Sequence, residues 1–290
     1  MSQFNVLNRY LFTDAHARGE LVQLSSSFES IIKNHNYPVG VEKLLGELLC
    51  ATCLLTATLK FEGDITVQLQ GDGPVGYMSV SGNNKQQMRG IAKMAEETSA
   101  DTLQTLIGKG TMIITIRPNA GEAYQGVVAL DEESLADCLA HYFDVSEQIP
   151  TKIWLFCDTE QQLAAGALVQ LLPDGDGSTE NKEQQQSDFE HLCQLTNTIK
   201  SEEVFSLEAE ALLYRLYHQE QVNIFEPQMV SYLCGCSADK CLSAISQIEP
   251  SEIKAILAEH GKISMTCDYC ITTYDFDELS LKSFISKVNH

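Results

Sequence analysis

Cys234-Gly-Cys236 and, further along the chain, Cys267-Asp-Tyr-Cys270 decide how the last part of this protein folds. The two cysteines of each pair are close enough in sequence to turn both sulfurs toward one point. Four soft thiolates in two chelating pairs are a ligand set that suits a tetrahedral zinc ion. The pattern therefore predicts one zinc ion bound by these four cysteines. The alternatives are free thiols or a plain pair of disulfides.

Other cysteines and one histidine were weighed as ligands. Cys241 lies beyond the tightest chelating turn, and a small buried apolar residue is its simpler interpretation. It is the first substitute if Cys234 or Cys236 is not a ligand. His260 stands at the expected end of a helix beside a glycine, where a solvated histidine is the ordinary outcome. Cys50-Ala-Thr-Cys53 lies inside a leucine-rich helical pattern and is interpreted as core packing.

Composition and charge limit the function classes. The chain has 290 residues, of which 44% are hydrophobic and 20% charged, an ordinary globular mixture. Its formal net charge of −21 argues against nucleic-acid partners, because phosphate binding needs a basic surface. The chain opens without a basic and apolar leader, and no run of about 20 apolar residues could cross a membrane. Ten cysteines without an export signal predict a reducing compartment, the cytoplasm.

The first part of the chain predicts an α+β domain, with a mixed or antiparallel sheet and one long central helix. Residues 41–59 are expected to form a helix with apolar residues on every side, which is typical of a buried helix. Residues 64–70 alternate strictly between apolar and polar, as in a strand with one buried face. The other expected strands, whose short connections favour antiparallel pairing, are residues 9–12, 20–24, 76–80, 111–116, 124–130, 152–157 and 166–172.

Three further segments complete this domain. A helix is expected at residues 26–34, with Ser26 reaching to Glu29 in a capping pattern, and another at residues 131–143. The polar residues 82–90 are expected to form a loop.

A change of composition separates this domain from the rest of the chain. Residues 173–187 contain no apolar side chain apart from one proline, which predicts a flexible linker. Two amphipathic helical patterns follow, and such helices must lean on another surface and are easily released from it. We therefore expect a domain at residues 1–178, a metastable helical linker at 179–229 and a zinc-binding domain at 230–290.

The last domain is too small for a self-sufficient core, so the zinc ion is expected to hold it together. The metal keeps its four sulfurs ionised, which makes them reactive toward oxidants. Such a domain folds with metal and is largely unfolded without it. Oxidation to disulfides removes ligands and releases zinc. The sequence thus predicts a reversible switch in which reductant folds the tail and oxidant unfolds it.

Long and specific segments carry a resemblance to a known family. They are Arg9-Tyr-Leu-Phe12, Arg18-Gly-Glu-Leu-Val22, Leu54-Leu-Thr-Ala-Thr-Leu-Lys-Phe61, Gly63-Asp-Ile-Thr-Val-Gln-Leu-Gln-Gly-Asp-Gly-Pro74, Gln86-Gln-Met-Arg-Gly90, Tyr124-Gln-Gly-Val-Val128 and Leu213-Tyr-Arg-Leu-Tyr-His218. With the cysteine pattern, they resemble the redox-regulated heat-shock holdases, also called the thirty-three-kilodalton chaperonin family. The resemblance covers nearly the whole chain.

The resemblance implies a cytoplasmic chaperone that uses no ATP and is not an enzyme. It assigns zinc to Cys234, Cys236, Cys267 and Cys270 in a reduced, inactive form. It also implies that oxidative stress, especially with heat, forms the disulfides Cys234–Cys236 and Cys267–Cys270 and expels zinc. The linker then unfolds and exposes apolar surface to unfolded or partly folded client proteins. The active form in this family is a homodimer.

Three other functions are alternatives. A zinc-ribbon protein that binds nucleic acid would carry basic residues near its cysteines, whereas this tail is acidic. A thiol oxidoreductase would place its C-x-x-C beside a βαβ unit rather than in a small tail. A catalytic zinc site would keep an open position with His or carboxylate ligands, unlike an all-cysteine set.

Overall fold

The computed structural model describes residues 4–58, 62–172 and 179–285. The chain divides into two compact units, of which the first ends at Tyr232 and the second begins at Leu233. Each unit has its own hydrophobic core. Among the described residues, no helix has the length and apolar character needed to cross a bilayer.

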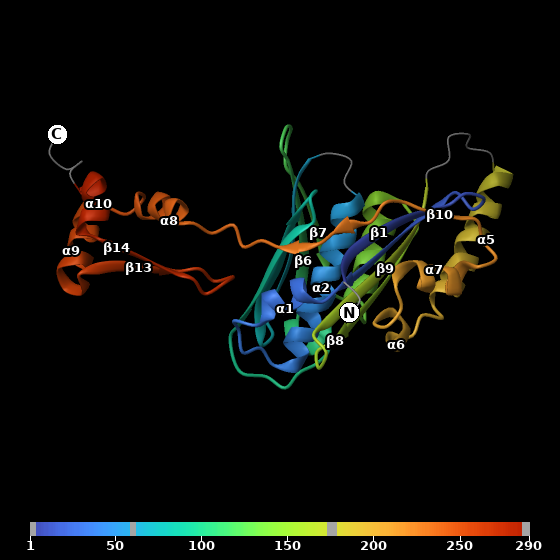
Figure 1. Cartoon of the computed structure of the whole chain (residues 1–290), viewed down its shortest axis with the longest axis horizontal. Helices are drawn as coiled ribbons and strands as arrows, with labels where there is room; N and C mark the ends of the chain where they lie inside the picture. The colour runs from blue at the N-terminus through green and yellow to red at the C-terminus, as the bar shows by residue number, and fades with distance from the viewer. Residues whose placement is uncertain (1–3, 59–61, 173–178, 286–290) are drawn as a thin grey trace. The chain divides into compact units, whose positions relative to one another are not determined.

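The first unit is built around α2 (Val39–Thr58), which lies between two sheets (Figure 1). Residues on all sides of this helix are buried, so the prediction of a central, fully apolar helix is confirmed. Packing is close enough that a Cβ atom at Gly46 would lie 2.7 Å from the Cys157 sulfur. Cys50 and Cys53 are completely buried in this helix, as core packing requires.

Sheet A has the strand order β10-β1-β2-β9-β8, and β11 also pairs with β1. All of its neighbouring strands are antiparallel. Its strands are β1 (Asn5–Phe12), β2 (Ala17–Leu24), β8 (Thr151–Asp158), β9 (Leu163–Leu171), β10 (Val222–Ile224) and β11 (Gln228–Met229). The strands expected at residues 9–12, 20–24, 152–157 and 166–172 are therefore confirmed.

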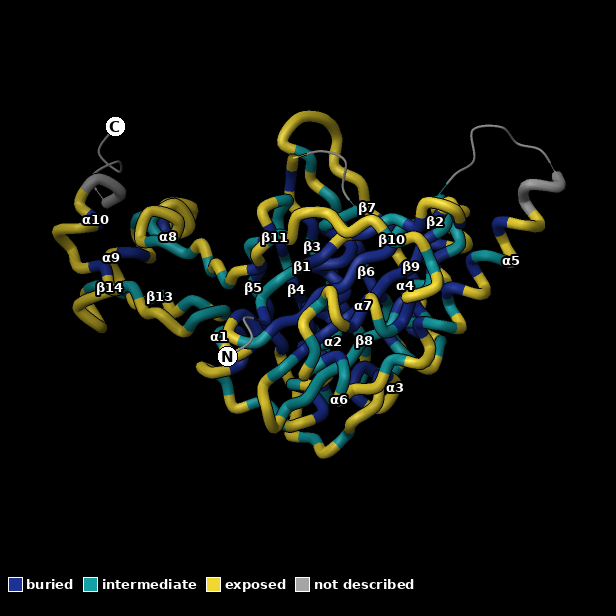
Figure 2. Tube along the Cα trace, turned by 45° about the vertical axis from the view of Figure 1, so that its right-hand side comes forward, coloured by how far each residue is buried: buried dark blue, intermediate teal, exposed yellow. Residues whose placement is uncertain are grey.

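Sheet B has the order β12-β5-β4-β3-β6-β7 and is antiparallel except for the parallel pair of β12 and β5. Its strands are β3 (Gly63–Gly71), β4 (Val75–Asn83), β5 (Gln87–Met94), β6 (Gly110–Pro118), β7 (Tyr124–Ala129) and β12 (Ser231–Tyr232). The inner faces of both sheets pack on α2 and form the buried centre seen in Figure 2. The predicted α+β class, with largely antiparallel sheets, is confirmed.

The prediction of a loop at residues 82–90 is wrong. Gly82 and Asn83 end β4, and β5 begins at Gln87 after a tight turn. The Asn83 carboxamide oxygen closes the turn by accepting hydrogen bonds from the backbone amides of Lys85 and Gln87, at 3.0 and 3.2 Å. Gln86 adopts a left-handed φ of 55°, and its buried side chain donates to the Cys53 carbonyl at 3.1 Å. The polar side chains here serve the turn, which is why they resemble a loop.

The capping pattern expected for the first helix is also wrong. Helix α1 (Ser26–Ile32) begins after Ser25, and Ser25 makes no side-chain capping bond. Asn5 of β1 does so instead, since its carboxamide oxygen accepts from the Ser27 amide at 2.9 Å and from the Ser27 hydroxyl at 2.6 Å. A cap that comes from a distant strand leaves no local sequence signal.

The remaining helices of this domain are short. They are α3 (Leu103–Ile107), α4 (Leu135–Tyr142) and the π-helical turn η1 (Phe143–Glu147). Helix α4 starts later than residue 131 because Ser134 is its N-cap and accepts from the Asp137 amide at 3.1 Å.

Three helices cover the outer face of sheet A. They are α5 (Thr179–Thr196), α6 (Ser201–Val204) and α7 (Ala209–Tyr217). The polar stretch 173–187 was predicted to be a flexible linker, but its residues from Thr179 onward belong to α5; residues 173–178 lie outside the described part of the chain.

A second core joins these helices to sheet A. It contains Tyr10, Phe12, Leu21, Val169, Phe189, Leu192, Leu212, Leu213, Leu216 and Tyr217. Polar contacts also join the helices to sheet A. The side-chain amide of the buried Gln23 donates to the Val204 and Leu207 carbonyls at 2.7 and 2.9 Å. The indole N–H of Trp154 in β8 donates to Asn197, just after α5, at 2.8 Å.

The second unit is small. Its elements are α8 (Ala238–Ile245), α9 (Pro250–His260), β13 (Lys262–Thr266), β14 (Thr273–Asp277) and α10 (Glu278–Ile285). Helix α9 has Pro250 at its first turn and Gly261, with φ 73°, at its C-cap, as expected. Among the residues whose burial is described, the core has five members, Ile245, Ile253, Ile263, Phe276 and Leu281. Hydrophobic burial alone is thus a weak basis for the stability of this unit.

Candidate metal centre

The first cysteine pair lies in the loop between β12 and α8. Gly235, between Cys234 and Cys236, has a left-handed φ of 67°, which a residue without a Cβ adopts at little cost. The Lys240 ammonium donates to the Gly235 carbonyl and holds this turn against the start of α8. The Ser237 hydroxyl caps the same helix by accepting from the Lys240 amide at 3.3 Å. The loop is therefore fixed at its carboxyl end by α8.

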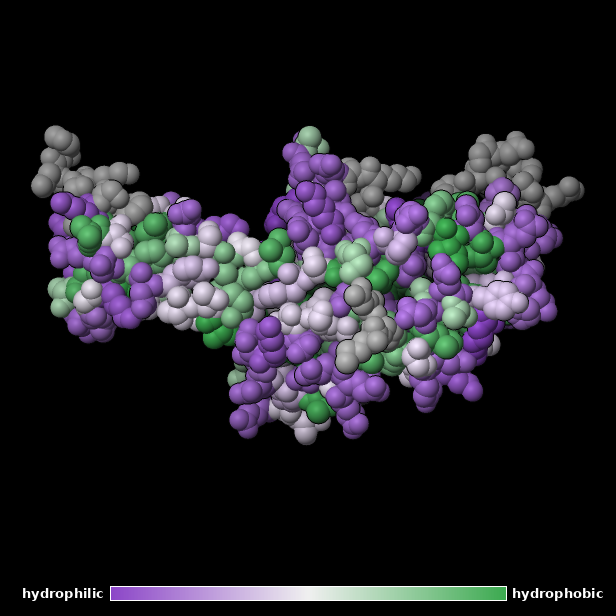
Figure 3. Space-filling view, in the orientation of Figure 1, coloured by the Kyte–Doolittle hydropathy of each residue, from purple (hydrophilic) through white to green (hydrophobic). Residues whose placement is uncertain are grey.

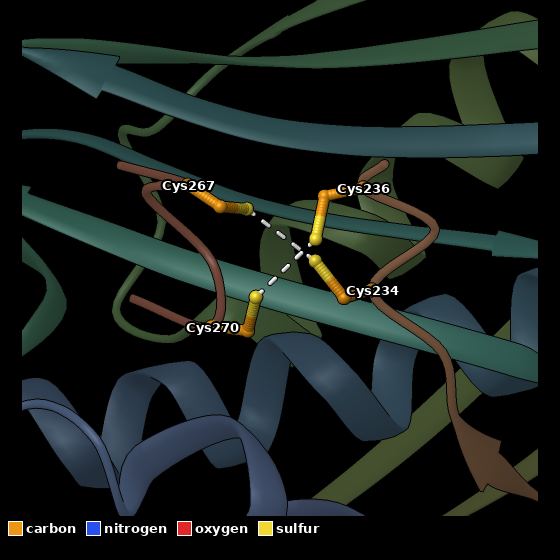
Figure 4. A group of neighbouring side chains, drawn as sticks. All are labelled: Cys234, Cys236, Cys267 and Cys270. Atoms are coloured by element: carbon orange, nitrogen blue, oxygen red, sulfur yellow. Dashed lines mark hydrogen bonds between the residues drawn. The ribbon is translucent and has the colours of Figure 1, made fainter. Parts of the chain in front are cut away.

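The second pair lies in the hairpin that joins β13 to β14. Cys267 directly follows β13, and its amide donates to the Thr272 carbonyl at 2.9 Å. The Ile271 amide donates to the Cys267 carbonyl at 2.8 Å, and Ile271 has a left-handed φ of 59°. These bonds close a tight loop that turns Cys267 and Cys270 to the same side, as Figure 4 shows.

The four sulfurs converge on one point (Figure 4). All lie within 4.8 Å of one another. The Sγ atoms of Cys234 and Cys267 are 3.4 Å apart, as are those of Cys236 and Cys270. A tetrahedral site with Zn–S bonds of about 2.3 Å requires sulfur separations of about 3.8 Å. The arrangement and the chemistry of the four donors therefore fit a zinc ion, and the group could hold a metal.

Neighbouring polar groups act on these thiols. Burial raises the pKa of the Cys234 thiol to about 12. Burial also acts to raise the pKa of the Cys270 thiol, but hydrogen bonds with the Thr272 hydroxyl and amide and with the other cysteines outweigh it and lower that pKa to about 6. The Tyr274 hydroxyl lies 3.1 Å from the Cys236 sulfur. Four thiolates crowded this closely require a cation to offset their mutual repulsion.

The other sequence candidates lie apart from this group. Cys241 is in α8 and packs against the small core of the second unit. His260 ends α9, is exposed, and has a ring nitrogen 3.8 Å from the Glu259 carboxylate. Among the described residues, the metal-ligating group contains neither of them. Thr272 carries no sequence signal of its contact with Cys270, because its place in the hairpin becomes visible only with the fold.

Comparison with known proteins identifies the family. A family model described as "Hsp33 protein" matches residues 5–277. The chain belongs to the Hsp33 family. Among curated relatives, the 33 kDa chaperonin of Shewanella sediminis is 54% identical over 288 residues, covering 99% of this chain and 97% of the relative. The 33 kDa chaperonin of Aeromonas salmonicida is 51% identical over 290 residues, with the same coverage of both chains.

A solved structure has a similar fold. The crystal structure of the 33 kDa chaperonin (heat shock protein 33 homolog) from Thermotoga maritima matches with a TM-score of 0.81 and 22% identity, covering 97% of this chain and 98% of that one. Membership of the Hsp33 family makes this chain a heat-shock chaperone, and its cysteine group is compatible with zinc and redox disulfide chemistry. The resemblance noted in the sequence is confirmed.

Proposed function

We propose that this protein is a redox-regulated holdase: it uses no ATP, is not an enzyme, and binds unfolding proteins only after oxidation. The observation that carries the proposal is a convergent group of four thiols in a unit whose described residues include five buried core members. Such a unit depends on what the thiols hold.

In the reduced, inactive form, Cys234, Cys236, Cys267 and Cys270 hold one zinc ion. When bound, zinc keeps the four sulfurs as thiolates and joins the loop before α8 to the β13–β14 hairpin. The Thr272 and Tyr274 hydroxyls lie 3.2 and 3.1 Å from the Cys270 and Cys236 sulfurs and would stabilise these sulfurs as thiolates by donating hydrogen bonds to them.

Oxidation removes the ligands. Two molecules of hydrogen peroxide accept four electrons from the four thiolates, take up four protons and leave as four molecules of water. Two S–S bonds form, Cys234–Cys236 and Cys267–Cys270, and the zinc ion leaves. The pairing follows the family resemblance. In the structure, each close pair of sulfurs joins one cysteine of the first motif to one of the second. A tetrahedral site brings all four sulfurs together, so these distances do not determine which disulfides form.

Loss of the metal destabilises residues 179–229, which we propose as the metastable linker. Helices α5 to α7 cover the apolar outer face of sheet A, where Tyr10, Phe12 and Leu21 are buried beneath them. On the face seen in Figure 3, hydrophobic side chains form only small patches among hydrophilic ones. Release of the helices would expose a larger continuous apolar surface, the kind that binds nonnative chains.

The expected partners are unfolded or partly folded proteins, with a homodimer as the active form and the cytoplasm as the compartment. Neither nucleic acid nor a membrane is an expected partner, in agreement with the net charge of −21.

The decisive experiment measures zinc release and suppression of client aggregation in the same sample during oxidation by warm hydrogen peroxide. Suppression should be absent in the reduced, zinc-loaded protein and should rise as zinc leaves. A Cys241→Ser variant is the matched control and should behave as the parent protein does. Equal suppression in both redox states would refute the proposal.

A further inference from the structure

The segment from Gln221 to Tyr232 forms three short strands along the edges of the two sheets. Its first part, β10, pairs antiparallel with the end of β1, and β11 pairs with the beginning of β1. Its last part, β12, then pairs with β5 of the other sheet. The segment therefore occupies the outer edge of β1 over most of that strand's length. An unpaired strand edge can pair with another chain, so the segment keeps other chains away from β1 while it is in place.

Backbone hydrogen bonds hold this segment to β1. The Phe225 amide donates to the Arg9 carbonyl at 2.9 Å, and the Val230 amide donates to the Asn5 carbonyl at 2.8 Å. The Thr13 amide in turn donates to the Gln221 carbonyl at 3.1 Å. Side chains contribute less, because Ile224, Phe225 and Met229 are 36%, 45% and 57% exposed. Only Val230 is buried in the core.

A strand held mainly through its backbone is replaceable by other sequences, since every non-proline residue offers the same amide and carbonyl. We propose that the outer edge of β1 is a client-binding surface, on which an extended segment of an unfolded protein pairs antiparallel in the place of residues 221–232. This inference rests on the proposed holdase function and gives it a mode of recognition, β-strand addition. Residues 221–232 then act as an internal substitute for the client.

The position of the segment explains its link to the redox state. Cys234 follows Tyr232, the end of β12, by two residues. While zinc holds Cys234, the carboxyl end of the segment is attached to a folded unit. Release of zinc leaves the short strands β10, β11 and β12 with only their own few pairs. Strands of two or three residues are the first to open.

The other edges fit this function less well. Beyond the pairs with β12, the edge of β5 is blocked at Ala92, whose amide donates to the Tyr37 hydroxyl at 3.1 Å and whose carbonyl accepts from it at 3.2 Å. The outer edges of β7 and β8 have no paired strand among the described residues, so no segment there is available for release. Of the two edges that residues 221–232 cover, β1 has the longer covered stretch, because β12 pairs with only two residues of β5.

Hydrogen exchange on the full-length protein locates the surface. Within residues 5–13, the amides that point to the outer edge of β1, as the Thr13 amide does, should be protected in the reduced, zinc-loaded protein and lose protection on oxidation. They should regain it when a reduced, carboxymethylated protein that stays unfolded is added. The Ala92 amide is the internal control and should stay protected throughout. Client-dependent protection at β7, with none at residues 5–13, would overturn the inference.

A peptide with the sequence of residues 221–233 tests whether the backbone is recognised. Antiparallel pairs alternate, so the amides of Phe225 and Val230 point toward β1 and those of Ile224 and Met229 point away. The parent peptide should bind the oxidised protein and displace the carboxymethylated client. N-methylation at positions 225 and 230 should weaken binding about tenfold or more, whereas N-methylation at 224 and 229 should change it little.

The two proposals fail separately. Equal binding of both methylated peptides, or no binding of the parent peptide, would overturn the edge-pairing inference even if the oxidised protein suppresses aggregation. Amide-dependent peptide binding without any suppression of aggregation would support the edge surface and refute the holdase function.

Discussion

The two compact units of this chain are stabilised in different ways. The first has a large continuous core in which α2 and the inner faces of two sheets bury dozens of apolar side chains. The part of the second that the structure describes has five buried core residues and a group of four cysteines. Truncating one core side chain costs the first unit about 2–5 kcal/mol but leaves most of its core in place, whereas removing one sulfur would take away a ligand of the proposed zinc ion in the second.

The difference teaches where a switch can be built. A unit with a large core keeps most of its contacts when one interaction is lost. A unit that depends on one metal centre folds or unfolds with the chemistry of a few atoms. The helices α5 to α7 and the strands β10 to β12 belong to the first unit but pack on its outside. We therefore expect them to be released more easily than the central core and less easily than the second unit.

The largest expected effect tests the dependence of the second unit on its sulfurs. Cys236→Ser should abolish tight zinc binding and remove about 10 kcal/mol or more of metal-linked folding free energy, so β13 and β14 should lose hydrogen-exchange protection. The first unit should keep its protection. Cys241→Ser is the control and should retain the metal. A Cys236→Ser protein that binds zinc stoichiometrically and stays folded at residues 262–277 would break the comparison.

A smaller effect tests the helices on the outside of sheet A. Leu212→Ala removes a fully buried side chain from α7 and should destabilise its packing by about 2–5 kcal/mol. The helices should then detach without oxidant, and the reduced protein should suppress aggregation in part. Emission of Trp154, the chain's single tryptophan, should shift to the red as it loses its contact with Asn197.

The matched control for this variant is Tyr214→Ala, because Tyr214 lies on the same helix and is 75% exposed. Unchanged Trp154 emission in Leu212→Ala, together with no suppression under reducing conditions, would mean that α7 is held as firmly as the central core.

The smallest effect concerns a buried carboxyl in the first unit. Burial raises the pKa of Glu20 from 4.5 to about 7, although the charges of Arg18 and Arg9 act to lower it. The folded state therefore binds this proton more tightly than the unfolded state. The free energy of unfolding should fall as the pH rises from about 4.5 to 7 and should stay at this lower value above pH 7.

Glu20→Gln should remove this penalty and stabilise the first unit by about 1–3 kcal/mol at pH 8, with little effect at pH 5. Urea unfolding followed by Trp154 emission measures both values, and Glu29→Gln on the exposed side of α1 serves as the control. An equal effect at the two pH values would show that the carboxyl stays ionised in the fold.

Local patterns predicted the central helix, most strands and the convergence of the cysteines. Each of these carries a period or a spacing, such as the alternation in residues 64–70 that became β3. The sequence did not reveal β10 to β12, because strands of two or three residues interrupted by Pro227 have no period. The cap of α1 by Asn5 was missed for a related reason: its two partners are distant in sequence and meet only in the folded sheet.

Of the cysteines of the first unit, Cys157 in β8 and Cys193 in α5 are partly exposed, whereas the other three lie buried in α2 and α4. Cys50, Cys53 and Cys138 have no exposed surface, and burial raises the pKa of each thiol. Thiols that stay protonated react slowly with peroxide. An oxidant should therefore react with the thiols of the tail before these three, so the core of the first unit should keep its sulfurs reduced while the tail is oxidised.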